Sequence, residues 1–351
     1  MRKLRGVIYL KRKIFSLILV VALLTLIVPV LSGRASQEGQ RSEKGASPNV
    51  KKLKTVKIAN YGGGVCFSPL YVAKEKGFFE KEGLNAELVR VDFEGTKEGL
   101  ATGKIDAALG LFYKWIKPVE QGMDIKFTAG LHTGCIQVVA GKNSGVTKVE
   151  DLRRKRIGVD AIGAGPMNFL AIALTRAGID WQKDITWRAY PADQLETALD
   201  KGEIDAVAIT DPFGQFILDK GKGRLILSLA ETKPYRDEYC CFVTVSGKTI
   251  KKDPEAAAAI TRALMNATLW VDEHRDEAAA LGIEKKYTGG TPSGNARLLA
   301  KYKYVPSVKK AQKDLLQAIK DLKAAGVLNV AKSPEALAEE MFIPVTEGIK
   351  K

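Results

Sequence analysis

The sequence is poor in histidine and cysteine and lacks the short motifs of the common hydrolytic sites. It has 2 histidines and 4 cysteines among 351 residues, which rules out an HExxH helix and paired CxxC motifs. It also contains no GxSxG segment and no P-loop lysine. These absences exclude the usual zinc peptidases, zinc-finger modules, α/β-hydrolases and P-loop nucleotidases.

Positive charge is abundant, but it is not clustered. The formal net charge is +15, and the first 35 residues hold seven Lys or Arg and no acid, which leaves +8 for the rest. Those remaining charges are spread along the chain, without the arginine clusters or basic runs expected of a nucleic-acid reader. We therefore expect a solvated surface and no nucleic-acid partner.

The N-terminus has the pattern of an export signal. A basic stretch that ends at Lys13 precedes the uncharged, almost wholly apolar run from Ile14 to Leu31. Gly33 and Ala35 follow at the spacing that a signal peptidase reads, which favours a cleaved signal peptide over residues 1–35. An uncleaved N-terminal anchor is the alternative, because a spanning helix needs about 20 apolar residues. Both interpretations predict export, to the periplasm or the cell surface.

An internal repeat is the strongest structural signal. The segment Gly103–Ala108 (GKIDAA) recurs as Gly202–Val207 (GEIDAV), 99 positions later. The glycine-rich loops at 61–64 and 162–165 also correspond, and each follows a short strand and precedes a helix. The repeat predicts two lobes of related topology.

Each copy reads as strand, glycine loop, helix, strand, helix and strand. In the first copy the expected elements are 56–60, 69–76, 86–91, 96–102 and 105–111; in the second they are 156–160, 166–177, 185–190, 192–201 and 204–210. Short β-branched strands that alternate with amphipathic helices predict an α/β fold with mixed, mostly parallel sheets flanked by helices. Ligands then bind beyond the carboxyl ends of the strands.

Two further extended stretches, 135–140 and 239–245, are interpreted as crossover strands between the lobes. We expect a flexible polar tether over 36–52 and the first part of lobe 1 over 53–137. Lobe 2 is expected over 138–240, and 241–351 is expected to return to lobe 1 with C-terminal helices. The long helix of that return begins at Asp253-Pro254-Glu255, an N-cap followed by a proline at the first helical position.

From Thr55 to about Ala280 the chain resembles the substrate-binding proteins of nitrate, sulfonate and taurine importers, a family that shares its fold with the fungal thiamine-pyrimidine synthase. The resemblance rests on several segments, which are Ser68–Ala73, Gly77-Phe78-Phe79, Gly83-Leu84, Gly103–Ala107, Val149–Arg153, Arg156–Val159 and Asp253-Pro254-Glu255. It implies the two-lobed type II periplasmic-binding fold, which holds its ligand between lobes that close by hinge motion.

The resemblance also implies that four loops line the cleft. Their candidate ligand-binding residues are Gly64, Cys66 and Phe67; Phe112, Tyr113 and Trp115; Gly163, Ala164, Gly165 and Asn168; and Asp211 and Phe213. Glycine permits close backbone approach, and a helix N-terminus at the third loop favours an anion or a carbonyl oxygen. Packing in the core is the alternative for each aromatic ring.

The third loop departs from the sulfonate-binding pattern, which carries serine or threonine hydroxyls where this chain has residues 163–166 (GAGP). An oxyanion would lose donors there. The departure favours a heteroaromatic or weakly anionic metabolite over a simple sulfonate or nitrate.

The cysteines form the last group of candidates. All four lie on loops or crossover strands near the expected cleft, namely Cys66, Cys135, Cys240 and Cys241. His132 lies close to Cys135 in sequence. Residues 239–243 (YCCFV) resemble the CCCFC motif of the pyrimidine synthase, with its first and last cysteines replaced. Three interpretations stay open. They are a disulfide from Cys135 to Cys240 or Cys241, a metal bound by these three thiolates with His132, and ordinary buried thiols.

These observations predict an exported, monomeric solute-binding protein with no cofactor unless the cysteines hold a metal. Its partners would be a small-molecule solute and the permease and ATPase of an ABC-type importer. A membrane-anchored ligand sensor is the alternative, and a synthase-like iron enzyme is a third, less favoured one.

Overall fold

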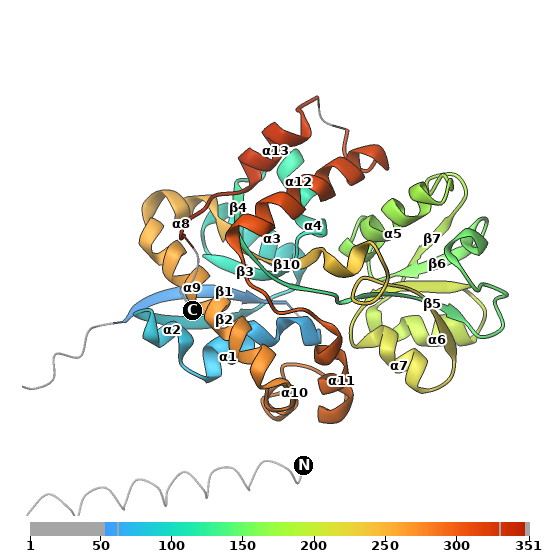
Figure 1. The fold of residues 1–351 in the computed structure, drawn as a ribbon, viewed down its shortest axis with the longest axis horizontal. Coiled ribbons are helices and arrows are strands. Elements are labelled where there is room, and N and C mark those ends of the chain that lie inside the picture. The colour runs from blue at the N-terminus through green and yellow to red at the C-terminus, as the bar shows by residue number, and fades with distance from the viewer. Residues whose placement is uncertain (1–52, 62, 330, 348–351) are drawn as a thin grey trace, which may run out of the picture. The chain divides into compact units, whose positions relative to one another are not determined.

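The computed structural model describes residues 53–61, 63–329 and 331–347, and its strands form two five-stranded sheets (Figure 1). Sheet A has the order β2-β1-β3-β10-β4 and is built from β1 (Lys54–Asn60), β2 (Leu84–Arg90), β3 (Ala107–Leu111), β4 (Ile125–Thr133) and β10 (Tyr239–Ser246). Strand β1 is parallel to β2 and β3, and β10 is antiparallel to β3 and β4. This sheet is the centre of lobe 1.

Sheet B repeats the same arrangement in lobe 2. Its order is β7-β6-β8-β5-β9, with β5 (Ile136–Gly141), β6 (Arg156–Val159), β7 (Thr186–Ala189), β8 (Ala206–Thr210) and β9 (Gly223–Ser228). Strand β6 is parallel to β7 and β8, whereas β5 is antiparallel to β8 and β9. Strand β5 enters lobe 2 after β4 and takes the position that β10 takes in lobe 1. The two-lobed fold with two crossover strands is confirmed.

The sequence repeat is also a repeat of hydrogen bonds. In lobe 1, Asp106 N donates to Lys57 O and Asp106 Oδ2 accepts from Lys57 N, both at 2.8 Å. In lobe 2, Asp205 makes the same two bonds with the backbone of Arg156, again at 2.8 Å. The aspartate of each GxID segment thus fastens the third strand of its lobe to the first. This role explains why the segment occurs twice.

Helices cover the faces of both sheets. They are α1 (Ser68–Glu75), α2 (Phe78–Lys81), α3 (Phe93–Thr102), α4 (Tyr113–Glu120), α5 (Gly165–Arg176), α6 (Leu195–Asp200), α7 (Phe213–Asp219), α8 (Gly247–Lys252), α9 (Pro254–Glu273), α10 (Arg275–Glu284), α11 (Pro292–Lys301), α12 (Val308–Ala324) and α13 (Pro334–Met341). Helix α9 begins as predicted, with the Asp253 side chain accepting from Ala256 N at 3.1 Å. Its apolar stripe packs into the core of lobe 1.

One predicted boundary differs in an instructive way. Strand β3 begins at Ala107 instead of Ile105. The N–H of Ile105 donates to Gly99 O in the turn that ends α3, so that residue is not free to pair with a neighbouring strand. The side chain of Ile105 is buried all the same, and this burial makes the segment read as strand from sequence.

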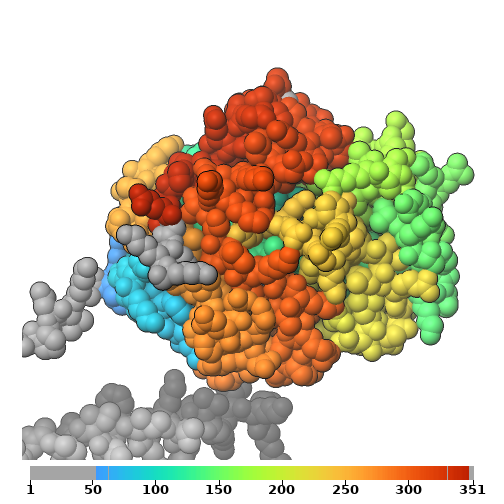
Figure 2. Space-filling view, in the orientation of Figure 1, coloured from blue at the N-terminus to red at the C-terminus, as the bar shows by residue number. Residues whose placement is uncertain are grey.

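The C-terminal third contacts both lobes, in addition to the expected packing on lobe 1. Arg176 of α5 pairs with Asp321 of α12 at 2.8 Å, and Arg297 of α11 lies 3.5 Å from Asp219 of α7. Figure 2 shows this contact as orange C-terminal atoms that lie against the yellow atoms of lobe 2. The segment after α10 therefore spans the junction of the lobes.

The predicted export signal at 1–35 and the tether at 36–52 lie outside the described residues. Within the described part, no helix is both long and apolar enough to cross a bilayer.

Candidate functional site

The loops after the parallel strands of the two lobes touch one another. From lobe 2, Asn168 Nδ2 donates to Tyr113 O of lobe 1 at 3.2 Å, and it also donates to Gly163 O at 3.0 Å. A methyl group placed on Gly64 of lobe 1 would lie 3.1 Å from Asp211 O of lobe 2. A side chain at Gly64 would therefore be tightly packed, and the two lobes are in direct contact here.

Asp211 is a carboxylate buried at this contact. Only 2% of its surface is exposed, and Oδ2 accepts from the Tyr302 hydroxyl at 2.6 Å. Its Oδ1 is also buried and has no hydrogen-bond partner in the described part of the chain. Burial raises the pKa of Asp211 to about 6, although the Tyr302 hydroxyl opposes this shift. A buried carboxylate oxygen without a hydrogen-bond partner is uncommon, and it leaves one acceptor open at the interlobe contact.

A lysine faces the same contact between two aromatic rings. The Lys114 ammonium lies 3.9 Å from the ring centre of Tyr61 and 4.4 Å from that of Phe93. Desolvation lowers the pKa of Lys114 to about 8, and the charge of Asp160, which follows β6 in lobe 2, acts in the opposite direction. The Tyr61 hydroxyl is held by Leu109 O at 3.0 Å, which fixes the ring. A cation held against two aromatic rings thus lies where the loops of the two lobes meet.

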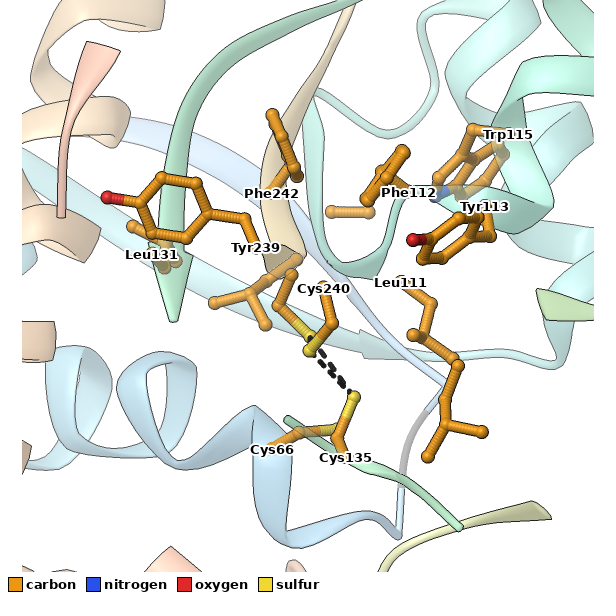
Figure 3. Packing of buried hydrophobic residues seen from close by; sticks show 14 of the residues in the cluster. Cys66, Leu111, Phe112, Tyr113, Trp115, Leu131, Cys135, Tyr239, Cys240 and Phe242 are labelled. Carbon is orange, nitrogen blue, oxygen red and sulfur yellow. Dashed lines mark hydrogen bonds between the residues drawn. The ribbon is translucent and has the colours of Figure 1, made fainter. Parts of the chain in front are cut away.

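The four cysteines converge beside Asp211, whose N–H donates to Cys135 O at 3.0 Å, and each is 2% exposed or less. Figure 3 shows Cys66, Cys135 and Cys240 among them. We call Cys66, Cys135, Cys240 and Cys241 the thiol cluster. The Cys135 sulfur is 2.8 Å from that of Cys240 and 3.9 Å from that of Cys241, and the latter two are 3.6 Å apart. The sulfurs of Cys66, Cys135 and Cys241 lie within 4.8 Å of one another. All four are free thiols in the structure.

His132 packs against this cluster with both ring nitrogens engaged. Nδ1 is 2.8 Å from Thr133 O, and Nε2 is 2.9 Å from Cys66 O. Burial opposes a charged imidazole, but Cys241 and the two carbonyl groups raise the pKa of His132. Burial also opposes a thiolate at Cys241, but hydrogen bonds with Cys135, Cys240 and Cys66 hold the pKa of that thiol well below its usual range. The pair favours a thiolate beside an imidazolium.

The remaining predicted site residues divide between cleft and core. Phe112 packs on Phe127 and Phe242 inside lobe 1, and Trp115 is fully buried against Phe93. Phe67 lies edge-on to Tyr61. Gly163, Ala164 and Gly165 lie at the start of α5, where Gly163 is exposed and Gly165 is buried. Phe213 begins α7 and packs on the lobe 2 core. Their roles in binding stay predictions.

Sequence reasoning missed three residues that the structure brings to this place, namely Lys114, Asp160 and Tyr302. Lys114 stands within the predicted aromatic loop, and Asp160 ends a predicted strand, so their positions were available signals. Tyr302 follows α11 in a segment without a recognisable motif. Its contact with Asp211 spans 91 residues and arises from tertiary packing alone.

A surface hollow of about 530 Å³ lies at the opposite edge of sheet B. Its lining includes Arg156 and Asp205, which are paired with each other at 2.8 Å. Parallel strands bind ligands beyond their carboxyl ends, whereas this hollow is at their amino ends. The interlobe contact therefore remains the candidate site.

The chain thus has two α/β lobes joined by two crossover strands, with charged, aromatic and thiol side chains where the lobes meet. This architecture defines the class of two-lobed binding proteins. The NMT1-like family model matches residues 51–283, and the chain belongs to this family. A putative aliphatic sulfonates-binding protein from Bacillus subtilis is 30% identical over 245 residues, covering 68% of this chain and 71% of that protein.

Solved structures show the same fold. The nitrate-binding protein NrtA from Synechocystis aligns with a TM-score of 0.69 at 16% identity over 83% of this chain and 86% of its own. The aliphatic sulphonate-binding protein SsuA from Escherichia coli aligns with a TM-score of 0.67 at 18% identity over 81% and 91%. At such identities the likeness establishes the architecture alone.

Proposed function

We propose that the chain is the exported solute-binding protein of an ABC-type importer and delivers a small metabolite to a membrane permease and its ATPase. Family membership and the two-lobed fold support this proposal. The observation that carries it is the buried Asp211 at the interlobe contact, because its Oδ1 lacks a partner while Oδ2 is held by Tyr302. Buried polar atoms are normally satisfied, and a ligand donor would satisfy this one.

The site suits a planar, weakly charged ligand that carries at least one hydrogen-bond donor. Asp211 would accept from that donor, and Tyr61 would provide an aromatic face. Lys114 would neutralise an acidic group, and its pKa of about 8 keeps it mostly charged at neutral pH. The absence of hydroxyl side chains at 163–166 disfavours a tetrahedral oxyanion there.

We infer binding without turnover. Both ring nitrogens of His132, the histidine nearest the interlobe site, hold carbonyl oxygens, so neither has a lone pair poised toward a substrate. Iron-dependent turnover of a bound metabolite by the purified chain would contradict this inference.

Thermal shift against a metabolite library tests the proposal, followed by small-angle scattering with each hit. A hit should raise the melting temperature and reduce the radius of gyration. Asp211→Ala should abolish the shift, whereas Asp193→Asn, an exposed change before α6 in lobe 2, should preserve it. A chain that responds to no metabolite, or whose response survives Asp211→Ala, would contradict the proposed site.

Export and a monomeric state belong to the same proposal. The mass of the protein recovered from outside the cytoplasm tests the two alternatives. A mass lower by the signal segment indicates cleavage, and the full mass indicates an N-terminal anchor. An anchored chain without a permease partner would favour the sensor alternative.

A further inference from the structure

All four cysteines of the chain meet at one buried point, although they come from three separate parts of the sequence. Cys66 lies in the short helix before α1, Cys135 lies between β4 and β5, and Cys240 and Cys241 begin β10. The chain has no other cysteine with which any of them could pair. Their meeting point joins lobe 1 to both crossover segments.

The backbone is shaped to bring these sulfurs together. Neighbouring residues of a regular strand point to opposite faces, yet the sulfurs of Cys240 and Cys241 are 3.6 Å apart. The pairing of β10 with β4 shifts register between Tyr239 and Cys241 and again before Phe242, and a bulge of this kind allows the two neighbouring sulfurs to approach each other. Cys135 has a φ of 81°, a conformation that costs a non-glycine residue free energy.

Two of the sulfur separations match those around a bound metal ion. A tetrahedral ion with metal–sulfur bonds of about 2.3 Å holds its sulfurs about 3.8 Å apart. The separations from Cys241 to Cys240 and Cys135 are 3.6 and 3.9 Å. The shortest separation, 2.8 Å between Cys135 and Cys240, is longer than a disulfide of about 2.05 Å and shorter than the metal-bound spacing, so a bound ion would move these two sulfurs apart.

His132 acts as a positioning residue for this cluster. Its Nε2 is bonded to the carbonyl of Cys66, and its Nδ1 is bonded to Thr133 O, two residues before Cys135. The ring therefore fixes the backbone of two cysteine-bearing segments. Outer-shell contacts of this kind orient the ligands of a metal.

We propose that the thiol cluster is a binding site for one resident thiophilic d10 ion, Zn²⁺ or Cu⁺. Soft thiolate ligands select these ions over hard ones such as Mg²⁺. Each thiol that binds exchanges its proton for the metal, and the protons pass to solvent. Complete burial suits a resident ion instead of a transported solute. The proposal does not depend on the solute-binding function.

The test uses the full chain, purified anaerobically, reduced, freed of metal with a chelator and desalted. Zn²⁺ alone, Cu⁺ alone and Mg²⁺ alone are then added, and retained metal is measured after gel filtration. One Zn²⁺ or one Cu⁺ per chain, with no Mg²⁺, is expected, and the tighter of the two identifies the ion. The proposal is overturned if the reduced chain retains neither Zn²⁺ nor Cu⁺. This holds also if the protein is isolated with a Cys135–Cys240 disulfide and its reduced form binds no metal.

Variants locate the ion. Cys66→Ser and Cys241→Ser should each weaken binding by more than the 10- to 100-fold that the loss of an outer-shell partner costs. Thr244→Val, a buried isosteric change three residues after Cys241 on β10, should leave the affinity unchanged. Thiolate-to-metal charge-transfer bands of the Co²⁺ form should be present in wild type and Thr244→Val and lost in both serine variants. Bands that persist in the serine variants would place the metal elsewhere and overturn the proposal.

Discussion

Asp211 is a residue whose proposed role in ligand binding comes at the expense of stability. Its carboxylate is buried with one oxygen unpartnered, an arrangement that the fold gains nothing from in the absence of a ligand. Residues of this kind are typical of binding sites, where function and stability compete.

Asp211 also makes stability depend on pH. Its pKa rises from 3.8 to about 6 on folding, so between these values the folded chain keeps a proton that the unfolded chain has lost. Stability should therefore fall as the pH rises from 4 to 6 and stay lower above 6. Asp211→Asn should remove this dependence and stabilise the protein by about 1–3 kcal/mol at pH 7.5. Urea unfolding at several pH values measures both effects.

Tyr302→Phe is the matched control, because it removes the one hydroxyl that lowers the pKa of Asp211. That variant should move the fall in stability toward higher pH. An Asp211→Asn protein whose pH dependence equals that of wild type would show that another group is responsible.

Residue-level prediction succeeded where local sequence carries the signal. The cysteines stand on a loop and on the two predicted crossover strands, and the structure brings these segments together. Tyr302 could not be predicted in the same way, since no local pattern tells which of ten tyrosines will reach a carboxylate 91 residues away. The mutual spacing of the sulfurs likewise depends on a bulge in β10 that the sequence does not reveal.

At the scale of elements, the first crossover is the most constrained segment. Gly134 has a φ of 91°, and a methyl group added there would lie 2.3 Å from the ring of Tyr302. Tyr302 in turn stacks on His132 and bonds Asp211. The crossover, the thiol cluster and the C-terminal segment thus form one packed unit.

Gly134→Ala should therefore destabilise the chain by on the order of 3 kcal/mol, through left-handed strain together with the clash. Gly145→Ala is the matched control, because its φ is 73° but nothing lies within 4 Å of the added methyl group. It should cost only about 1 kcal/mol. Equal losses in the two variants would mean that the Tyr302 contact carries no energy.

The order of elements was predictable from two local signals. These are the alternation of short β-branched strands with amphipathic helices and the repeated GxID segment. Asp106 and Asp205 each fasten a third strand to a first strand, and this role is visible in both copies. The contacts of α11 and α12 with lobe 2 were not predictable, because they depend on surface ion pairs such as Arg176–Asp321.

At the scale of the whole described unit, the lobes meet at glycines where a side chain would be tightly packed. Gly64 faces Asp211 O across the contact, and Gly165 faces Leu111 at 3.2 Å. Closure of this kind brings groups of both lobes onto one ligand, which is how such proteins bind.

Gly64→Ala should hold the lobes apart, because its methyl group would lie 3.1 Å from Asp211 O and 3.2 Å from the Cys66 sulfur. We expect a larger radius of gyration by small-angle scattering and a stability within about 1 kcal/mol of wild type. Gly63→Ala is the neighbouring control, with nothing within 4 Å of the added methyl group. An unchanged radius in Gly64→Ala would show that this contact does not limit closure.

Native mass spectrometry of the gently purified chain tests the central claim most directly. Wild type and the exposed control Asp193→Asn should carry one small organic molecule that is released on denaturation, and Asp211→Ala should not. A chain that holds no small molecule, and to which no metabolite can be added back, would contradict its assignment as a solute-binding protein.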